Sequence, residues 1–261
     1  MSAEAMIELR SLHKTFGTGA EEVRAVEGVD LKISPREIVA FIGPSGCGKS
    51  TLLNMIAGLY EATAGEVYYN GREVTDVNTN VGYMTQKDNL LPWRNVLDNV
   101  ALPLEINGWS RERRYEAARA MIAHVGLDGF EDKYSSELSG GMRKRACLAR
   151  MLLYGPQALL LDEPFAALDA QLRIAMHELL LRLWQENQQT IVLVTHDLVE
   201  AITLADRVVV FTKRPARVAF EQAIDLPRPR DVQAVRFTKH FQRLYDTIWQ
   251  RLREEYVEEK L

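Results

Sequence analysis

The stretch Ile38-Val39-Ala40-Phe41-Ile42-Gly43-Pro44-Ser45-Gly46-Cys47-Gly48-Lys49-Ser50-Thr51 joins a continuous apolar run to a glycine-rich loop. The run reads as a buried parallel strand, and the apolar segment 51–58 after the loop predicts a helix. Glycines let backbone N–H groups turn inward around phosphate oxygens, and a helix N-terminus adds positive potential. We expect Lys49 to neutralise β- and γ-phosphates and Ser50 to bind magnesium. The stretch therefore predicts an α/β fold with a nucleotide phosphate site.

The phosphate loop by itself does not identify one class of nucleotide-binding protein. It is compatible with a nucleotide kinase, a GTPase or a helicase as well as with other ATPases. No N-K-x-D sequence follows it, which weakens the GTPase reading. A purely structural turn would give Lys49 no reason to begin an apolar helix.

Two further apolar runs end in residues suited to chemistry. Asp162 and Glu163 follow the run 158–161, and carboxylates at the end of a buried strand are costly unless a cation or substrate uses them. We expect Asp162 to hold magnesium through water and Glu163 to polarise the attacking water as general base. His196 follows the run 191–195, at the carboxyl end of a predicted parallel strand, where open α/β sheets bind ligands.

A fourth segment, Leu138-Ser139-Gly140-Gly141-Met142, lies between the phosphate loop and the acidic strand end. It opens a predicted helix over 142–154, so its free N–H groups and the Ser139 hydroxyl form an anion site. The segment has no task at the nucleotide of its own chain. It therefore suggests that a second copy of the chain completes the site.

This order of motifs resembles the ATP-binding subunit of ABC transporters over nearly the whole chain. The resemblance implies an ATPase that uses ATP and Mg²⁺, in which Gln86 ligates magnesium and links the site to a membrane partner. It implies that His196 contacts the γ-phosphate and orients water. Phe16 corresponds to the aromatic residue that stacks on adenine, although a surface packing role is the alternative.

The resemblance also implies an ATP-dependent homodimer. Each ATP would lie between the phosphate loop of one subunit and the signature segment, residues 138–142, of the other. Asp169, after Ala166-Ala167-Leu168, corresponds to the loop that communicates between the two sites. Met142 and Ala166 depart from the usual glutamine and serine, and these changes affect no phosphate, metal or base function.

The resemblance predicts the fold class as a P-loop NTPase, with a RecA-like α/β core, an antiparallel β subdomain and an inserted helical signature subdomain. We expect one ABC ATPase domain over 1–261, with the core at 1–87 and 156–220. The helical subdomain would span 88–155 and a C-terminal helical tail 221–261. Strands are expected over 6–33 and 66–69, and helices over 112–125 and 142–154. Apolar residues at helical spacing predict a packed tail helix, and they are Phe237, Phe241, Leu244, Ile248, Leu252 and Tyr256.

Two local sequences resemble the nitrate/sulfonate/taurine importer branch. One contains Leu90, Leu91, Pro92, Trp93 and Arg94, and the other spans 225–231. The first implies contact with a membrane permease, and an extracytoplasmic or periplasmic solute-binding protein would take part indirectly. The expected location is peripheral, at the cytoplasmic face of the cell membrane. The alternative is an ABC ATPase not tied to transport, of the translation or DNA-repair type.

Composition fits this reading. The chain has 261 residues and a formal net charge of −4, which disfavours nucleic acid as the main partner. Its two cysteines, Cys47 and Cys147, are expected to be reduced thiols in a cytosolic protein. We expect no signal peptide, and no apolar run approaches the roughly 20 residues of a membrane span.

Overall fold

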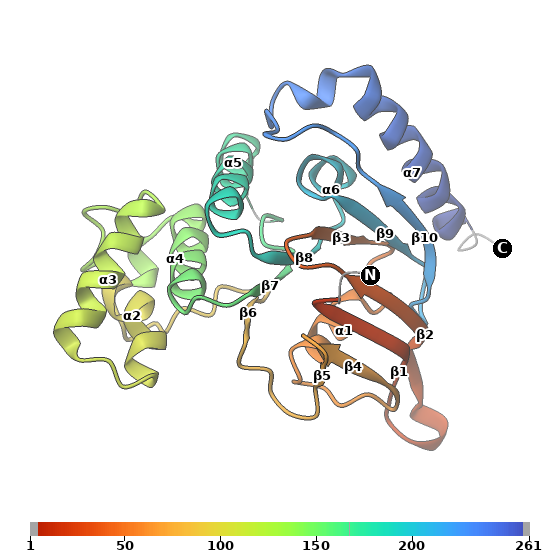
Figure 1. Ribbon diagram of the computed structural model, residues 1–261, viewed down its shortest axis with the longest axis horizontal. Coiled ribbons are helices and arrows are strands. Elements are labelled where there is room, and N and C mark those ends of the chain that lie inside the picture. Colours follow the sequence, from red (N-terminus) through yellow and green to blue (C-terminus); the bar gives the residue numbers. More distant parts are fainter. Residues whose placement is uncertain (1–4, 167, 258–261) are drawn as a thin grey trace.

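The computed structural model describes residues 5–166 and 168–257, and within them a six-stranded sheet forms the centre of the molecule (Figure 1). The strand order is β10 (Val218–Ala223), β9 (Arg207–Phe211), β3 (Ile38–Ile42), β8 (Thr190–Val194), β7 (Ala158–Asp162) and β6 (Val81–Met84). β10 pairs antiparallel with β9, and the other pairs are parallel. Every residue of β3, β7 and β8 is buried, which explains their continuous apolar runs.

The second sheet of the described chain has four antiparallel strands in the order β2-β1-β4-β5. These are β2 (Val23–Ile33), β1 (Ile7–Phe16), β4 (Ala64–Tyr69) and β5 (Arg72–Glu73), and a short 3-10 turn, Gly19–Glu21, joins β1 to β2. Along β2, Val29, Leu31 and Ile33 are buried while the residues between them are exposed. After β4 the chain turns tightly at Asn70-Gly71, where both residues have positive φ values, 48° and 73°.

Helices cover both faces of the central sheet. One face of the central sheet, which presents Val39 and Phe41, packs against α1 (Lys49–Ile56) and the antiparallel sheet in a single apolar core. α5 (Ala170–Asn187), α6 (Leu198–Leu204) and α7 (Lys239–Val257) lie on the other face, with Ile38 and Ala40 (Figure 1). This layering places the carboxyl ends of β3, β7 and β8 together at one sheet edge, beside the start of α1.

A group of three helices stands to one side of the sheets (Figure 1). It consists of α2 (Val96–Ile106), α3 (Arg111–His124) and α4 (Gly140–Leu153), with a 3-10 turn, Ser135–Glu137, before α4. Each helix begins at a side-chain cap, and the capping residues are Asn95, Ser110 and Ser139. The predicted helices over 112–125 and 142–154 are present and begin one or two residues earlier.

The C-terminal prediction needs one correction. Phe241, Leu244, Ile248 and Leu252 of α7 are buried against the sheet and α6, as expected. The prediction that Phe237 packs as part of this helix is wrong, because Phe237 ends the 3-10 turn Val235–Phe237 and is 80% exposed. The side chain of Tyr256 lies outside the described residues.

The predicted division into core, helical subdomain and tail stays a prediction. β10 crosses its boundary at residue 220, because the strand continues to Ala223. None of the described helices combines the length and apolar character that crossing a bilayer requires.

Candidate nucleotide site

The phosphate loop runs from the end of β3 into α1. Gly48 holds φ at 130°, and a Cβ atom there would lie 2.5 Å from the carbonyl oxygen of Ala25 on β2. Only glycine avoids both the backbone strain and this clash. The antiparallel sheet thus supports the loop from one side, and residues 48–51 at the start of α1 line a cavity.

Lys49 occupies the inside of the loop. Its Nζ donates to the carbonyl oxygens of Gly43 and Pro44, both at 2.8 Å, and lies 3.6 Å from Sγ of Cys47. The side chain is only 5% exposed and forms no ion pair with any carboxylate of the described chain. A buried ammonium held by neutral carbonyls is suited to receive an anion.

Ser50 and Asp162 meet beside this lysine. The Ser50 hydroxyl donates to Oδ1 of Asp162 at 3.0 Å, although the residues are far apart in sequence. Burial raises the pKa of Asp162; the Ser50 hydrogen bond lowers that pKa and the charge of Glu163 raises it. The pair therefore places a carboxylate that gains from a cation next to a hydroxyl.

Glu163 joins two further predicted residues. Its Oε2 accepts a hydrogen bond from the Gln86 amide at 3.2 Å and lies 3.5 Å from Nδ1 of His196. Its backbone is left-handed, with φ at 47°, and its N–H donates to Val194 of β8. This conformation turns the carboxylate away from the sheet and towards the two neighbouring side chains.

One cavity of about 720 Å³ brings most of these side chains together, and Asp162, which is not part of its lining, contacts it through Ser50. Its lining includes Phe16, Ser45, Gly46, Gly48, Lys49, Ser50, Thr51, Gln86, Glu163 and His196. Phe16 is partly exposed and contacts Tyr60 edge to face, at 5.5 Å between ring centres. The cavity thus has an aromatic wall and a phosphate-loop wall.

Sequence reasoning missed Arg214, which also lines this cavity. It lies in the turn between β9 and β10, in a segment that none of the sequence motifs includes. No pattern around it indicated a nucleotide site, since its position depends on how the turn packs.

The signature segment, residues 138–142, does not line the cavity. The Ser139 hydroxyl caps α4 by accepting the Met142 N–H at 3.3 Å, and Leu138 is buried. A Cβ atom on Gly141 would lie 2.2 Å from Leu172 of α5, so glycine permits this close packing. Ser139 and Gly140 lie at the start of α4, and neither lines the cavity of their own chain.

Asp169 caps α5 in the same way, because its carboxylate accepts the Leu172 N–H at 2.9 Å. Its neighbour Ala166 is exposed, and Ala167 lies outside the described residues. The starts of α4 and α5 therefore meet at Leu172, which brings Asp169 and the signature segment to neighbouring positions.

A buried lysine, also missed from the sequence, ties α4 to Gln86. Lys144 is 4% exposed, donates to the backbone carbonyl of Gln86 at 2.8 Å and pairs with Asp88 at 3.0 Å. Arg143 pairs with the other oxygen of Asp88 at 3.0 Å. These contacts anchor α4 to the segment that carries Gln86.

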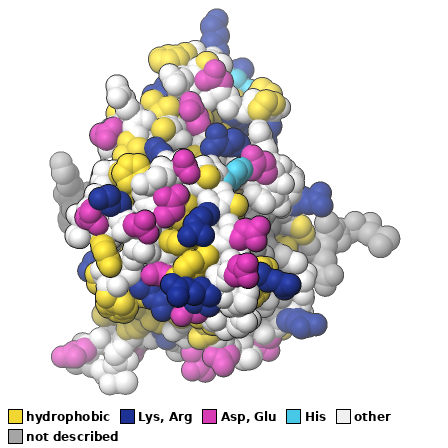
Figure 2. All heavy atoms as spheres, turned by 90° about the vertical axis from the view of Figure 1, so that its left-hand side faces the viewer, with side chains coloured by type: hydrophobic (Ala, Val, Ile, Leu, Met, Phe, Trp, Pro, Cys, Tyr) yellow, Lys and Arg dark blue, Asp and Glu magenta, His cyan; other side chains and the backbone are white. Residues whose placement is uncertain are grey.

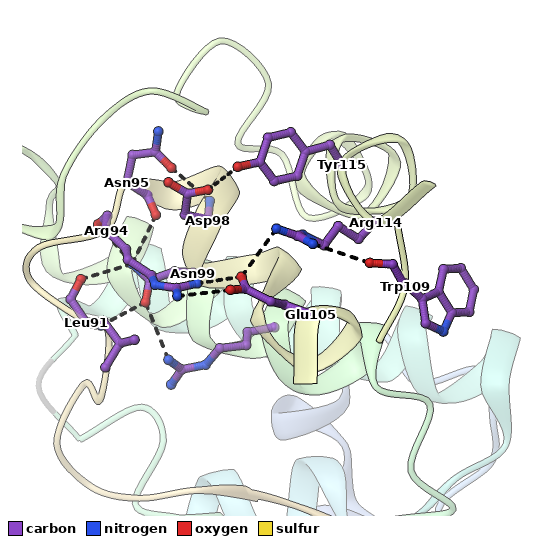
Figure 3. Close-up of polar contacts among 10 residues, drawn as sticks. Leu91, Arg94, Asn95, Asp98, Asn99, Glu105, Trp109, Arg114 and Tyr115 are labelled. Carbon is purple, nitrogen blue, oxygen red and sulfur yellow. Dashed lines mark hydrogen bonds and ion pairs between the residues drawn. The ribbon is translucent and has the colours of Figure 1, made fainter. Parts of the chain in front are cut away.

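The segment 90–94 is held by one side chain of α2 (Figure 3). Asn99, 1% exposed, accepts the Leu91 N–H at 2.7 Å and donates to the carbonyls of Leu91, Arg94 and Asn95 at 3.0 to 3.1 Å. Arg150 approaches the same Asn99 oxygen at 3.5 Å. These contacts fix a turn that sequence periodicity alone leaves undefined.

Arg94 extends this network, since it makes two hydrogen bonds to Glu105, at 2.8 and 3.3 Å (Figure 3). Arg114 approaches the same carboxylate at 3.7 Å and donates to the backbone carbonyl of Trp109. Trp93 stays 72% exposed, whereas Leu90 is buried in the core. The apolar side chains of this segment therefore differ in burial, because Leu90 packs inside and Trp93 lies on the surface.

Next to this turn lies a groove of about 580 Å³ between the helical group and β6. Exposed apolar side chains at its border include Leu59, Val77 and Ile106. Figure 2, which faces the helical side of the molecule, shows hydrophobic side chains interspersed with basic and acidic ones.

A family model described as ABC transporter matches residues 26–166, more than half of the chain. The chain belongs to the ABC transporter family. It is 42% identical over 213 residues to the taurine import ATP-binding protein TauB of Escherichia coli (strain K12), covering 82% of each chain. It is 44% identical over 243 residues to the aliphatic sulfonates import ATP-binding protein SsuB of Ralstonia nicotianae, covering 93% of this chain and 82% of the relative.

An uncharacterized ABC transporter ATP-binding protein of Methanocaldococcus jannaschii is 42% identical over 242 residues, covering 93% and 91%. Among solved structures, a dimeric ATP-binding cassette in a post-hydrolysis state with ADP and phosphate is similar, with a TM-score of 0.76 and 32% identity. The similarity covers 85% of this chain and all of that one. The predicted family, its importer branch, the P-loop fold and the ATPase class are thereby confirmed.

Proposed function

We propose that the cavity binds ATP through the residues predicted from the sequence. The phosphate-loop N–H groups and Lys49 would hold the triphosphate, and Phe16 would stack on adenine. The observation that carries this proposal is the buried ammonium of Lys49, which contacts loop carbonyls and no carboxylate of the described residues. Such a charge gains most when a phosphate replaces the carbonyls it now contacts.

Ser50, Asp162 and Gln86 would hold Mg²⁺. They offer a hydroxyl, a carboxylate and an amide oxygen, the hard ligands that this ion prefers. Among the described residues no cluster of three or more His, Cys, Asp or Glu suits a metal on its own. The nucleotide would supply further oxygen ligands, and the ion would neutralise phosphate charge.

Glu163 would act as general base for hydrolysis. Its carboxylate faces the cavity and accepts a hydrogen bond from Gln86, so it can take a proton from a water aimed at the γ-phosphate. His196, within 3.5 Å of Glu163, would orient that water and contact the γ-phosphate. Gln86 would report phosphate occupancy to the rest of the molecule.

The second half of each site would come from another copy of the chain. The signature segment lies outside its own cavity, at the free start of α4 and beside Asp169. This position suits contact with the ATP of a partner subunit. The similar cassette of known structure is dimeric, which supports a homodimer that closes on ATP.

The experiment is the Glu163→Gln variant. The amide keeps the shape and removes the base, so the variant should bind Mg-ATP, turn over very slowly and sediment as a dimer with ATP and a monomer without. Ser139→Arg in the same background should stay monomeric, since its bulk and charge block the opposing phosphates. A mass that does not depend on ATP would refute the two-subunit site.

We further propose that the groove and Trp93 receive a membrane permease. Trp93 is exposed although Asn99 fixes the backbone around it, and exposed tryptophans beside apolar grooves are typical of protein interfaces. The helical face in Figure 2 carries both acidic and basic side chains, which suits a protein partner better than a partner with a uniformly anionic surface. Leu91, Pro92 and Arg94 would border the contact.

Trp93→Ala should lower transport by the assembled complex and leave the ATPase of the isolated chain nearly unchanged. Trp249→Ala is the matched control, because Trp249 is also exposed but lies on α7, where it stacks with Tyr245. Equal losses of Trp93→Ala in both assays would mean that Trp93 supports the fold instead.

The transported solute is proposed to be a small anionic or organic compound such as nitrate, a sulfonate or taurine. The relatives named for taurine and aliphatic sulfonate import support this class. The chain would work at the cytoplasmic face of the membrane, and a separate solute-binding protein would select the solute. Uptake of labelled taurine, an alkanesulfonate and nitrate in a deletion strain would test the choice.

A further inference from the structure

We propose that Arg214 is a nucleotide-binding residue that contacts the ribose and α-phosphate region of ATP. The inference rests on the proposed ATP site and adds a residue that no motif includes. Arg214 lies in the turn that joins β9 to β10 and lines the same cavity as Phe16 and Lys49. Its side chain is exposed.

The turn that carries Arg214 is held by its own hydrogen bonds. Two hydrogen bonds join Thr212 and Arg217. The Thr212 N–H donates to the Arg217 carbonyl at 3.0 Å, and the Thr212 hydroxyl accepts the Arg217 N–H at 3.0 Å. The same hydroxyl donates to the Pro215 carbonyl at 2.9 Å. The backbone position of Arg214 is thus set before any ligand binds.

The turn is also fixed to the site itself. The Ala216 N–H donates to the Ala25 carbonyl at 2.9 Å, and the Ala216 carbonyl accepts the Glu27 N–H at 3.0 Å. A Cβ atom on Gly48 would lie 3.0 Å from the Ala216 side chain. The turn therefore touches both β2 and the phosphate loop.

This contact decides which part of the nucleotide Arg214 can reach. Phe16, Val23 and Ala25 make the apolar end of the cavity, and Gly46, Lys49 and Ser50 make its phosphate end. Arg214 is carried by a turn packed against Ala25 and Gly48, between these ends. The ribose and the α-phosphate are the parts of ATP that lie between base and terminal phosphates.

The charge of Arg214 is available for this contact. Its guanidinium forms no hydrogen bond or ion pair with any part of the chain that the structure describes. The other lining cation, Lys49, already contacts two loop carbonyls. A guanidinium stays charged at all physiological pH values and offers several donors to phosphate and hydroxyl oxygens.

The test measures the Kd of ATP and of ADP, each with Mg²⁺, by calorimetry on the full chain. Arg214→Ala should weaken both nucleotides by the same factor, roughly tenfold, because both carry the α-phosphate. Arg214→Lys should recover part of the loss, because lysine keeps the positive charge. Arg217→Ala is the matched control, since Arg217 lies on the same turn but pairs with Glu27 at 2.9 Å outside the cavity.

Unchanged Kd values in Arg214→Ala, with an unchanged thermal midpoint, would overturn the inference. A loss confined to ATP would overturn it too, because it would move the contact to the γ-phosphate. Equal losses in Arg217→Ala would show that the turn, and not the cation, matters. If the wild-type chain bound neither nucleotide, the proposed ATP site would fall as well.

Discussion

Replacing Asn99 by alanine should loosen the segment 90–94 and lower the stability of the whole protein. The side chain is 1% exposed and serves four backbone groups: the N–H of Leu91 and the carbonyls of Leu91, Arg94 and Asn95. Alanine removes all four contacts and fills less space. Water would reach some of these groups, because the segment borders the surface.

Each lost hydrogen bond contributes about 1 kcal/mol net, and a buried partner left unsatisfied costs more. The three carbonyls share the two hydrogens of one amide, so the contacts are not fully additive. We therefore expect the free energy of unfolding to fall by roughly 3 kcal/mol. Local loosening would also increase hydrogen exchange at the Leu91 N–H.

Urea unfolding of Asn99→Ala, compared with Asn107→Ala, tests this expectation. Asn107 follows the end of the same helix α2 and is exposed, so its replacement should cost little. A loss below about 1 kcal/mol for Asn99→Ala, or a loss equal to that of Asn107→Ala, would refute the assigned role. A changed m-value would show that the unfolded surface had changed as well.

Three other predictions concern the site. Lys49→Ala should abolish hydrolysis and weaken ATP binding by a few kcal/mol, measured by calorimetry, because it removes the buried cation of the loop. Asp162→Asn should raise the thermal midpoint of the nucleotide-free chain at pH 7, since burial raises the pKa of this acid and so disfavours its ionised form in the folded state. That gain should shrink as pH falls through the raised pKa and vanish below the ordinary value of 3.8; a gain independent of pH would contradict it. Gly141→Ala should lower stability by about 1 kcal/mol in urea unfolding through overpacking against Leu172, and Leu172→Ala should reduce this cost; additive losses would exclude the contact.

Local patterns predicted most of the core of the fold. The strands β3, β7 and β8 are buried on both faces, so each is a continuous apolar run. Such a run indicates a buried strand even when the neighbouring strand and the pairing register are unknown. The phosphate loop, Asp162, Glu163 and His196 follow these runs directly. Residues at the carboxyl ends of neighbouring parallel strands necessarily meet, which is why sequence order alone brought them together.

Other features depend on contacts between distant segments. Lys144 looks like one more charge of a basic helix, and its burial follows from Asp88 and Gln86 on another element. Arg214 reaches the cavity only because its turn packs on β2. Phe237 fits the spacing of α7, but the chain enters that helix through a 3-10 turn that points the ring outwards. Periodicity records which residues share a face and does not record where the helix begins.

The bond from Lys144 to the Gln86 carbonyl has a consequence for how two subunits would work. Ser139 caps α4, the helix that contains Lys144, so the Lys144 hydrogen bond connects Gln86 to the signature segment that would contact the neighbour's nucleotide. If the residues have the proposed roles, ATP binding at one site would change the ATP affinity of the other site. The coupling free energy would be the same in both directions. The two ATP molecules would then bind cooperatively, and the Lys144 hydrogen bond would couple their two sites.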